Sequence, residues 1–270
     1  MSIKRIYAIF IRQMFLLRHN PARLVNIFLW MAIDIVLWGF ITRYLDGLNG
    51  FDFSFANVLF GAIILWGFLI RIQQGVMVAF FEDVWSQNFI NYFASPLTIS
   101  EYISGLVISS IFSGILGFTF NLALAGLAFG FNIFNLGLSL LPFLLVLFVF
   151  GVALGVFTAA VVLRLGPSAE WIAWPLTAIL SPLAAVFYPV SALPGALQIV
   201  AHGLPPAYVF ESMRAIVISG APLYGQLSSL AGGFGLAVIY LAAAYFFFIY
   251  IYRLVLRRGL ITRFSAETSS

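Results

Sequence analysis

Six long runs of apolar residues dominate the sequence, and each is long enough to cross the hydrocarbon core of a membrane as a helix. A helix rises 1.5 Å per residue, so a crossing takes roughly 20 mostly apolar residues. The chain is 63% hydrophobic and 8% charged, which is typical of an integral membrane protein. We therefore expect an all-α fold with six transmembrane helices. The predicted spans are Leu24–Ile41, Phe55–Phe80, Tyr102–Phe129, Leu136–Leu163, Trp171–Tyr188 and Leu227–Tyr252.

Lys and Arg gather at both ends of the chain, and this pattern predicts the orientation. Positive residues are retained on the cytoplasmic side of a membrane. Both termini are therefore predicted to be cytoplasmic, which agrees with an even number of spans. With that topology the interval 82–100 is also cytoplasmic and the interval 190–226 lies outside. The residues concerned are Lys4, Arg5, Arg12, Arg18 and Arg23 at the start, and Arg253, Arg257, Arg258 and Arg263 at the end.

Residues 1–20 have the apolar periodicity of an interfacial helix. Their apolar residues recur at helical spacing, with Arg5 and Arg12 on the opposite side. We expect this helix to lie along the cytoplasmic membrane surface before Asn20 and Pro21 turn the chain into the first span. The predicted apolar face consists of Ile3, Ile6, Tyr7, Phe10, Met14 and Leu17.

The external interval 190–226 is apolar but broken by prolines. Its pieces of about 10 to 12 residues are too short to span a membrane, which predicts a helical hairpin that is either re-entrant or interfacial. Pro175 and Pro182 also interrupt the fifth span, where they either set the shape of the helix or provide a hinge.

The stretch FFEDVWSQNFINYFASPLTISEYISG, residues 80 to 105, is a polar and aromatic interval between two apolar runs. Trp85, Phe89 and Phe93 recur every four residues, so a short helix here would carry an aromatic stripe. The interval has no Lys or Arg and is locally acidic, which suits a partner surface better than an anionic lipid surface. An amphipathic turn lying on the membrane is the alternative.

Two stretches resemble the transmembrane permease of type 2 ABC exporters, which export polysaccharides, lipids and drugs. ASPLTISEYISG, from Ala94, is similar to the family's lead into the third span. SPLAAVFYPVSALPGALQIVAHGLPPAYVFESMR, from Ser181, is similar to its fifth-span and hairpin signature. The order of parts is similar over nearly all of residues 1–270. The matching signature positions are Phe187, Tyr188, Pro189, Leu193, Pro194, Leu197, Pro205, Tyr208, Glu211 and Arg214.

The resemblance implies that 82–100 is a coupling helix that docks in a groove of a separate ATPase subunit. The chain has no GxxxxGK[ST] loop, so ATP and Mg would be held by that ATPase and no cofactor by this chain. Six spans form half of the usual pathway, so a homodimer with two ATPase subunits in a bacterial inner membrane is implied. The implied docking residues are Glu82, Asp83, Trp85, Phe89, Asn91, Phe93, Pro96, Leu97 and Glu101.

Charged residues in or near the spans are candidates for the pathway or its gate. Asp34 lies near the middle of the first span and Arg71 within the second, where a charge is costly unless it faces protein or water. Asp34 is expected to be either an internal structural residue or part of the pathway lining. Glu211 and Arg214 form either a local ion pair or a gate, and Tyr188 belongs to the same region.

Other functions have weaker support. The chain has no Cys and two His residues, and no HExxH or GxSxG motif, so nothing predicts a metal site or a catalytic nucleophile. An ion-coupled secondary transporter or channel is the alternative function, although such proteins usually carry several intramembrane carboxylates. We expect lipid and protein partners and no nucleic acid. The substrate is expected to be an amphiphile, such as a drug, a lipid or a lipid-linked glycan.

Overall fold

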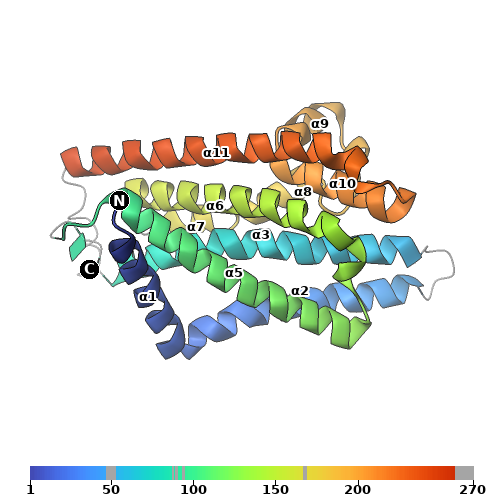
Figure 1. Cartoon of the computed structure of the whole chain (residues 1–270), viewed down its shortest axis with the longest axis horizontal. Coiled ribbons are helices and arrows are strands. Elements are labelled where there is room, and N and C mark those ends of the chain that lie inside the picture. The colour runs from blue at the N-terminus through green and yellow to red at the C-terminus, as the bar shows by residue number, and fades with distance from the viewer. Residues whose placement is uncertain (47–52, 87, 89–90, 93–94, 167–168, 259–270) are drawn as a thin grey trace.

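The structure is a computed structural model, which describes the chain apart from residues 47–52, 87, 89–90, 93–94, 167–168 and 259–270. The described residues form helices and no strand, so the predicted all-α class is confirmed (Figure 1). In chain order the elements are α1 (Ile3–His19), α2 (Pro21–Asp46), α3 (Phe53–Trp85), α5 (Ile99–Phe129), the 3-10 helix η1 (Ile133–Ser139), α6 (Leu140–Leu165), α7 (Glu170–Ala173), α8 (Leu176–Leu183), η3 (Val190–Ala192), α9 (Gly195–His202), α10 (Pro205–Ser219) and α11 (Leu223–Arg257).

Among the described residues, four helical stretches are long and apolar enough to cross a membrane, which indicates a membrane-embedded protein. They coincide with the second, third, fourth and sixth predicted spans, and they are Val58–Trp85, Ile99–Phe129, Leu136–Leu165 and Leu223–Arg257. The first predicted span, Leu24–Ile41, lies in α2, a continuous helix of 26 residues that is not among these four. The total of six spans therefore stays a prediction.

The predicted fifth span, Trp171–Tyr188, is not one continuous helix. It consists of α7 and α8, and the chain leaves helical geometry after Leu183. Pro175 occupies the N-cap of α8, where its missing N–H is no loss, and Pro182 lies in the last turn of α8. Eight residues of helix rise about 12 Å, so α8 alone is too short to cross a membrane.

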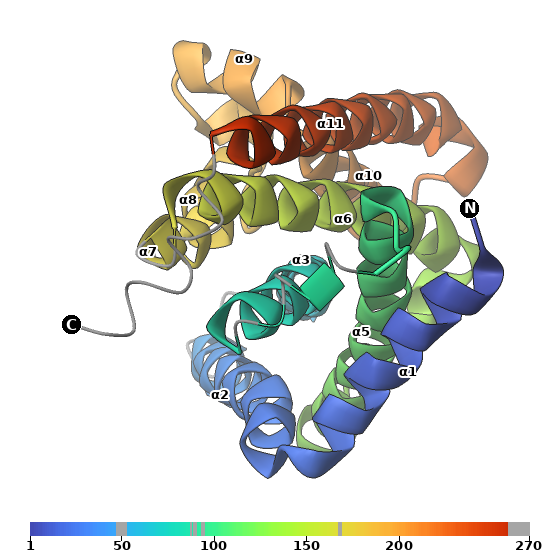
Figure 2. The same ribbon diagram turned by 90° about the vertical axis from the view of Figure 1, so that its left-hand side faces the viewer.

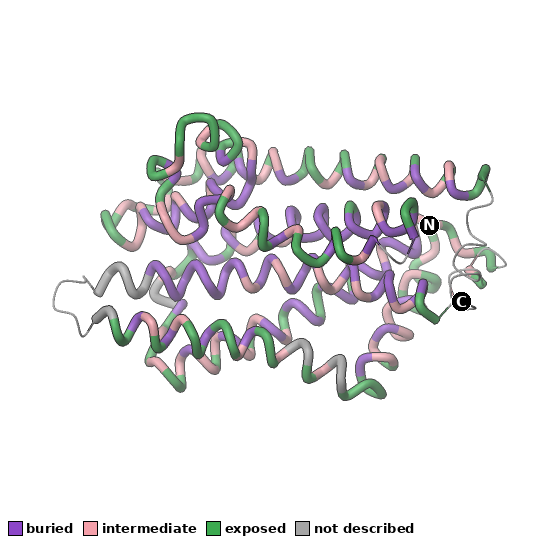
Figure 3. The backbone as a smooth tube through the Cα atoms, turned by 180° about the vertical axis from the view of Figure 1, so that it is seen from behind, coloured by how far each residue is buried: buried purple, intermediate pink, exposed green. Residues whose placement is uncertain are grey.

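Helix α3 lies at the centre of the bundle, with α5 and α6 packed against it (Figure 2). Helix α11 packs on the outer side of α6, and α2 covers α3 and α5. Buried residues accordingly concentrate in α3 and α6, whereas α2 and α11 are largely exposed (Figure 3). In a membrane these exposed apolar faces would contact lipid or another protein, because apolar side chains do not have to be shielded from hydrocarbon.

Glycines allow α3 and α6 to approach closely. A methyl group on Gly155 of α6 would lie 2.7 Å from Val76 Cβ and 2.9 Å from the Gln73 carbonyl oxygen, both in α3. Gly151 and Gly155, which have the GxxxG spacing that permits close helix approach, both face α3 of the same chain. At the end of α5, Gly130 has a φ of 71° and closes the helix in the left-handed conformation that glycine adopts most readily.

Helix α1 crosses one end of the bundle, which we call the α1 end (Figures 1 and 2). It packs mainly against α5, and its buried residues are Ile9, Gln13 and Leu17. The prediction that Arg5 and Arg12 lie opposite the packed face is wrong. Both side chains reach buried carboxylates in the bundle, because an ion pair compensates those charges better than an apolar contact would.

The predicted external interval forms η3, α9 and α10 at the opposite end of the bundle, which we call the α10 end (Figure 1). Helix α10 begins with Pro205 and Pro206, where missing N–H groups cost nothing, and ends at Gly220 with a φ of 63°. It packs against α3, α6 and α11, and its Phe210 ring is fully buried beside Trp66. Helix α10 is therefore part of the packed core at this end.

Candidate functional site

The interval between α3 and α5 is held to α1 by a cluster that we call the α1 junction: Arg5, Arg12, Asp83, Tyr92 and Glu101. Its first part is centred on Asp83, which is fully buried at the end of α3 and forms an ion pair with Arg12. Arg12 Nη1 also donates a hydrogen bond of 2.5 Å to Tyr92 Oη. A single guanidinium thus joins α1, α3 and the segment that follows α3.

Tyr102 completes this part of the junction from the first turns of α5. Its fully buried hydroxyl donates to Asp83 Oδ2 at 2.7 Å, so the carboxylate has a partner on each oxygen. Burial and the negative charge of Asp83 raise the pKa of Tyr92, which keeps its hydroxyl protonated at neutral pH. Burial alone would lower the pKa of Arg12, but the charge of Asp83 raises it above its ordinary value.

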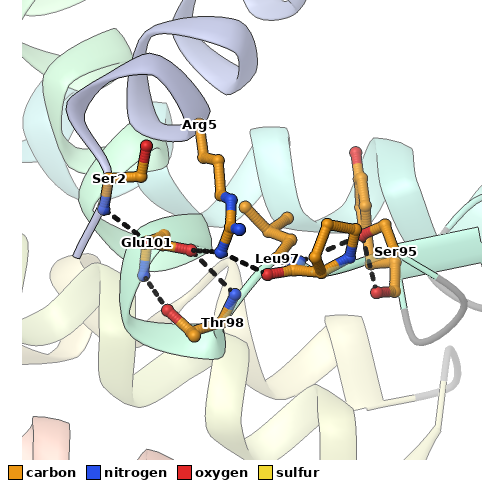
Figure 4. A network of polar contacts seen from close by, with 8 residues as sticks. Ser2, Arg5, Ser95, Leu97, Thr98 and Glu101 are labelled. Carbon is orange, nitrogen blue, oxygen red and sulfur yellow. Dashed lines mark hydrogen bonds and ion pairs between the residues drawn. The ribbon is translucent and has the colours of Figure 1, made fainter.

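The second part of the junction is centred on Glu101, which is 2% exposed (Figure 4). Glu101 and Thr98 form a capping box: Thr98 Oγ1 accepts from the Glu101 N–H at 3.3 Å, and Glu101 Oε2 accepts from the Thr98 N–H at 2.9 Å. The backbone N–H of Ser2 donates to Glu101 Oε1 at 2.6 Å. The start of α5 and the start of α1 are thus bound to the same carboxylate.

Arg5 links this carboxylate to the loop before it. Its Nη1 lies 3.4 Å from Glu101 Oε2 and donates to the Pro96 carbonyl oxygen at 2.5 Å.

A third contact comes from α7, where Glu170 Oε1 accepts a 2.5 Å hydrogen bond from the indole N–H of Trp85. Partial burial raises the pKa of Glu170, and the Trp85 bond opposes that shift. Described residues in and beside the segment 86–98 are therefore bonded to α7, α1 and α5.

The structure changes which residues of the predicted docking surface face outward. Asp83 and Glu101 do not: the prediction of an exposed acidic surface is wrong for them, because they neutralise Arg12 and Arg5 inside the bundle. Trp85 is 50% exposed at the end of α3. Asn91 and Pro96 are also exposed, while Glu82 and Leu97 are partly buried. Phe89 and Phe93 lie outside the described residues.

Sequence reasoning missed the α1 side of this site. Arg5 and Arg12 looked like the polar face of an interfacial helix, and Tyr92 and Glu170 carried no pattern that distinguished them. One local signal was available, because Thr98 and Glu101 have the S/T-x-x-E spacing of a capping box before an apolar run. That spacing indicates a carboxylate turned toward backbone N–H groups and away from a partner.

A second polar network lies at the α10 end. Arg214, which is largely buried, donates to the Ala185 carbonyl oxygen at 2.9 Å and to the Val186 carbonyl oxygen at 3.2 Å. It also pairs with Glu211 at 2.9 Å, so the predicted local ion pair is confirmed. Glu211 Oε1 in turn accepts from the Val190 N–H at 2.7 Å.

This network stabilises the irregular chain that follows α8. Ala185 has a φ of 51°, a left-handed conformation that is uncommon for a residue with a side chain. Its carbonyl oxygen has left the helical ladder, and Arg214 replaces the lost hydrogen bond. Tyr188 closes the same turn, because its hydroxyl donates to the Pro182 carbonyl oxygen at 2.7 Å. These three predicted gate residues, Tyr188, Glu211 and Arg214, thus fix the shape of the chain between α8 and η3.

Asp34 and Arg71 lie in different environments. Arg71 is buried in α3 beside α5, where a methyl group on Gly117 would come within 3.3 Å of Arg71 Cγ. Asp34 lies on the exposed face of α2, among exposed apolar residues such as Trp30 and Leu37. In the part of the chain that the structure describes, no ion pair joins the two. Asp34 is exposed on a single copy of the chain, and its role, whether structural or in the pathway lining, stays a prediction.

No cluster of three or more His, Asp or Glu side chains suited to a metal ion occurs among the described residues. Comparisons with protein-family models and with curated proteins find no match to the chain. The resemblance to type 2 ABC exporters therefore rests on the residue patterns quoted above.

Proposed function

We propose that the chain is the transmembrane permease of an ATP-driven exporter of the type 2 ABC class. It works as a homodimer, and a separate ATPase subunit docks on the segment 86–98 of each copy. The observation that carries the proposal is that described residues in and beside this segment are bonded to three helices at one end of the bundle: Tyr92 and Pro96 to α1, Thr98 to α5, and Trp85 to α7. A free amphipathic turn on a membrane surface needs no such attachment.

The junction suits the transfer of work from a docked partner. Helix α3 has 33 residues, a length of about 50 Å, and it runs through the centre of the bundle from the segment to the α10 end. A displacement of the segment would act directly on the ends of α3 and α5, and through Arg12 on α1. Because helices are stiff and closely packed here, such a displacement reaches the far end as a movement of whole helices.

The proposed substrate is an amphiphile that passes between the two copies. Helix α2 offers a face for this path, because it combines exposed apolar residues with the carboxylate of Asp34. A carboxylate in the middle of such a face is costly against lipid and is tolerated against water or protein. The hydrocarbon and polar parts of an amphiphile match that combination.

The test is a pull-down of the detergent-solubilised protein from its native membrane. The wild type is compared with a Trp85→Ala/Phe89→Ala/Phe93→Ala variant and with Tyr224→Ala, an exposed aromatic at the start of α11 near the α10 end. We expect an ATPase to co-purify with the wild type and with Tyr224→Ala, and to be lost from the folded triple variant. Absence of an ATPase from all three would overturn the proposal and favour an ion-coupled secondary transporter.

A further inference from the structure

A groove of about 640 Å³ lies between α5, α6 and α11, and one of its ends is next to the α1 junction, where Met1 and Ser100 line it. Its walls are aliphatic and include Val107, Val152, Val156, Leu241 and Ala242. The volume falls within the range of ligand pockets in proteins, roughly 300 to 1,000 Å³. Because α5 and α11 are both long enough to cross a membrane, hydrocarbon chains would surround this groove in a bilayer.

One end of the groove is polar. Ser100 and Ser104 of α5 and Tyr245 of α11 contribute hydroxyl groups there, and Ser100 Oγ lies 2.8 Å from Tyr245 Oη. Whichever hydroxyl donates in this pair, the hydrogen of the other stays available to an acceptor in the groove. Ser100 lies in the first turn of α5, so the polar end faces the α1 end of the bundle.

A cationic residue continues the same face of α11 beyond the hydroxyl groups. Arg253 follows Ala242 by eleven residues, which is about three turns, so both lie on one side of the helix. Arg253 is exposed. Side chains lean toward the N-terminus of their helix, which brings the guanidinium back toward Tyr245. Glu101, in the first turn of α5, does not line the groove and is paired with Arg5.

We propose that this groove binds an anionic glycerophospholipid of the membrane leaflet at the α1 end. One acyl chain occupies the aliphatic walls, the remaining hydrogen of the Ser100–Tyr245 hydroxyl pair is donated to an ester carbonyl, and Arg253 pairs with the phosphate. The order of apolar, hydroxyl and cationic groups along the groove matches the order of acyl chain, ester and phosphate in such a lipid. This site is independent of the proposed export function, since it needs only a membrane around the helices.

The experiment measures lipid retained by the full-length protein. The purified protein in mild detergent is titrated with dioleoylphosphatidylglycerol or dioleoylphosphatidylcholine, and bound lipid is counted by native mass spectrometry. Ala242→Trp fills the groove, while Ala243→Trp places the same bulk on a neighbouring exposed position outside it. Arg253→Gln removes the cation, and Arg18→Gln removes an exposed cation from α1 as its control.

We expect the wild type to retain phosphatidylglycerol in preference to phosphatidylcholine. Ala242→Trp should abolish the retention and Ala243→Trp should leave it unchanged. Arg253→Gln should lower the preference about fivefold, the effect of one cation beside an anionic lipid surface, and Arg18→Gln should not. Equal retention of both lipids, or equal loss in the two Trp variants, would overturn the proposal. A lipid-free dimer that cross-links through α5 and α11 would also overturn it, because a second copy would then fill the groove.

Discussion

Removing either partner of the Arg12–Asp83 ion pair should destabilise the protein, but by unequal amounts. Asp83 is fully buried, whereas the Arg12 side chain is 28% exposed. Arg12→Leu leaves a carboxylate buried without its counter-charge, although Tyr102 still donates to it. Asp83→Asn leaves a guanidinium that can turn toward water and a neutral side chain that still accepts hydrogen bonds. The arginine replacement should therefore be the more damaging of the two.

The expected magnitudes follow from the cost of an unpaired buried charge. Removing one partner of a buried pair costs about 3 to 5 kcal/mol, and the partial exposure of Arg12 places Arg12→Leu near 3. Asp83→Asn exchanges charged for neutral hydrogen bonds and should cost about 1.5 kcal/mol. The double variant leaves no unpaired charge, so we expect about 2 kcal/mol in place of the additive 4.5 or so.

The assay is the free energy of unfolding from reversible SDS titration in mixed micelles, with helix content as the signal. Arg18→Leu, which removes an exposed cation from the same helix, is the control and should change that free energy by less than about 0.5 kcal/mol. The reasoning fails if Arg12→Leu costs no more than Arg18→Leu. It also fails if the double variant loses the sum of the two single losses, because the two side chains would then act independently.

Three further variants test other parts of the structure. Arg214→Met leaves two backbone carbonyl oxygens without their hydrogen-bond donor and should lower the free energy of unfolding by about 2 to 3 kcal/mol in the same titration. Glu211→Gln should cost less, because the new side chain can still accept a hydrogen bond, and the reverse order would contradict the assigned contacts. Gly155→Val should abolish the peak of folded protein in size-exclusion chromatography, while Gly235→Ala, where the added methyl meets open space, should not. A folded but monomeric Gly155→Val variant would instead place Gly155 between copies. Asp34→Asn should leave the yield of folded protein unchanged, and loss of folded protein would indicate a structural role for the carboxylate.

The long helices were predictable because their signal is local. Apolar length alone places α3, α5, α6 and α11 close to where the structure has them. The break within 171–188 was indicated by Pro175, but where the chain leaves helical geometry depends on Arg214, which supplies the hydrogen bonds from 29 residues away. Local sequence patterns do not encode such a partner.

The α1 junction was not predictable for the same reason. The charges of Asp83 and Glu101 suggested an exposed acidic surface, whereas their partners Arg12 and Arg5 lie in α1, more than 70 residues earlier in the chain. Helical periodicity assigned those arginines to a solvent-facing side. It cannot show that a helix folds back so that its charged side meets buried carboxylates. The capping-box spacing at Thr98 was the one local sign that Glu101 turns inward.

The most direct measurement is photo-cross-linking from the segment 86–98 in the native membrane. A photoreactive amino acid replaces Asn91, which is exposed in this segment, or Tyr224 near the α10 end as the control. We predict that position 91 forms an adduct with a nucleotide-binding ATPase that carries a GxxxxGK[ST] loop, and that position 224 does not. Lipid adducts alone at position 91 would contradict the docking role of the segment and with it the proposed exporter function.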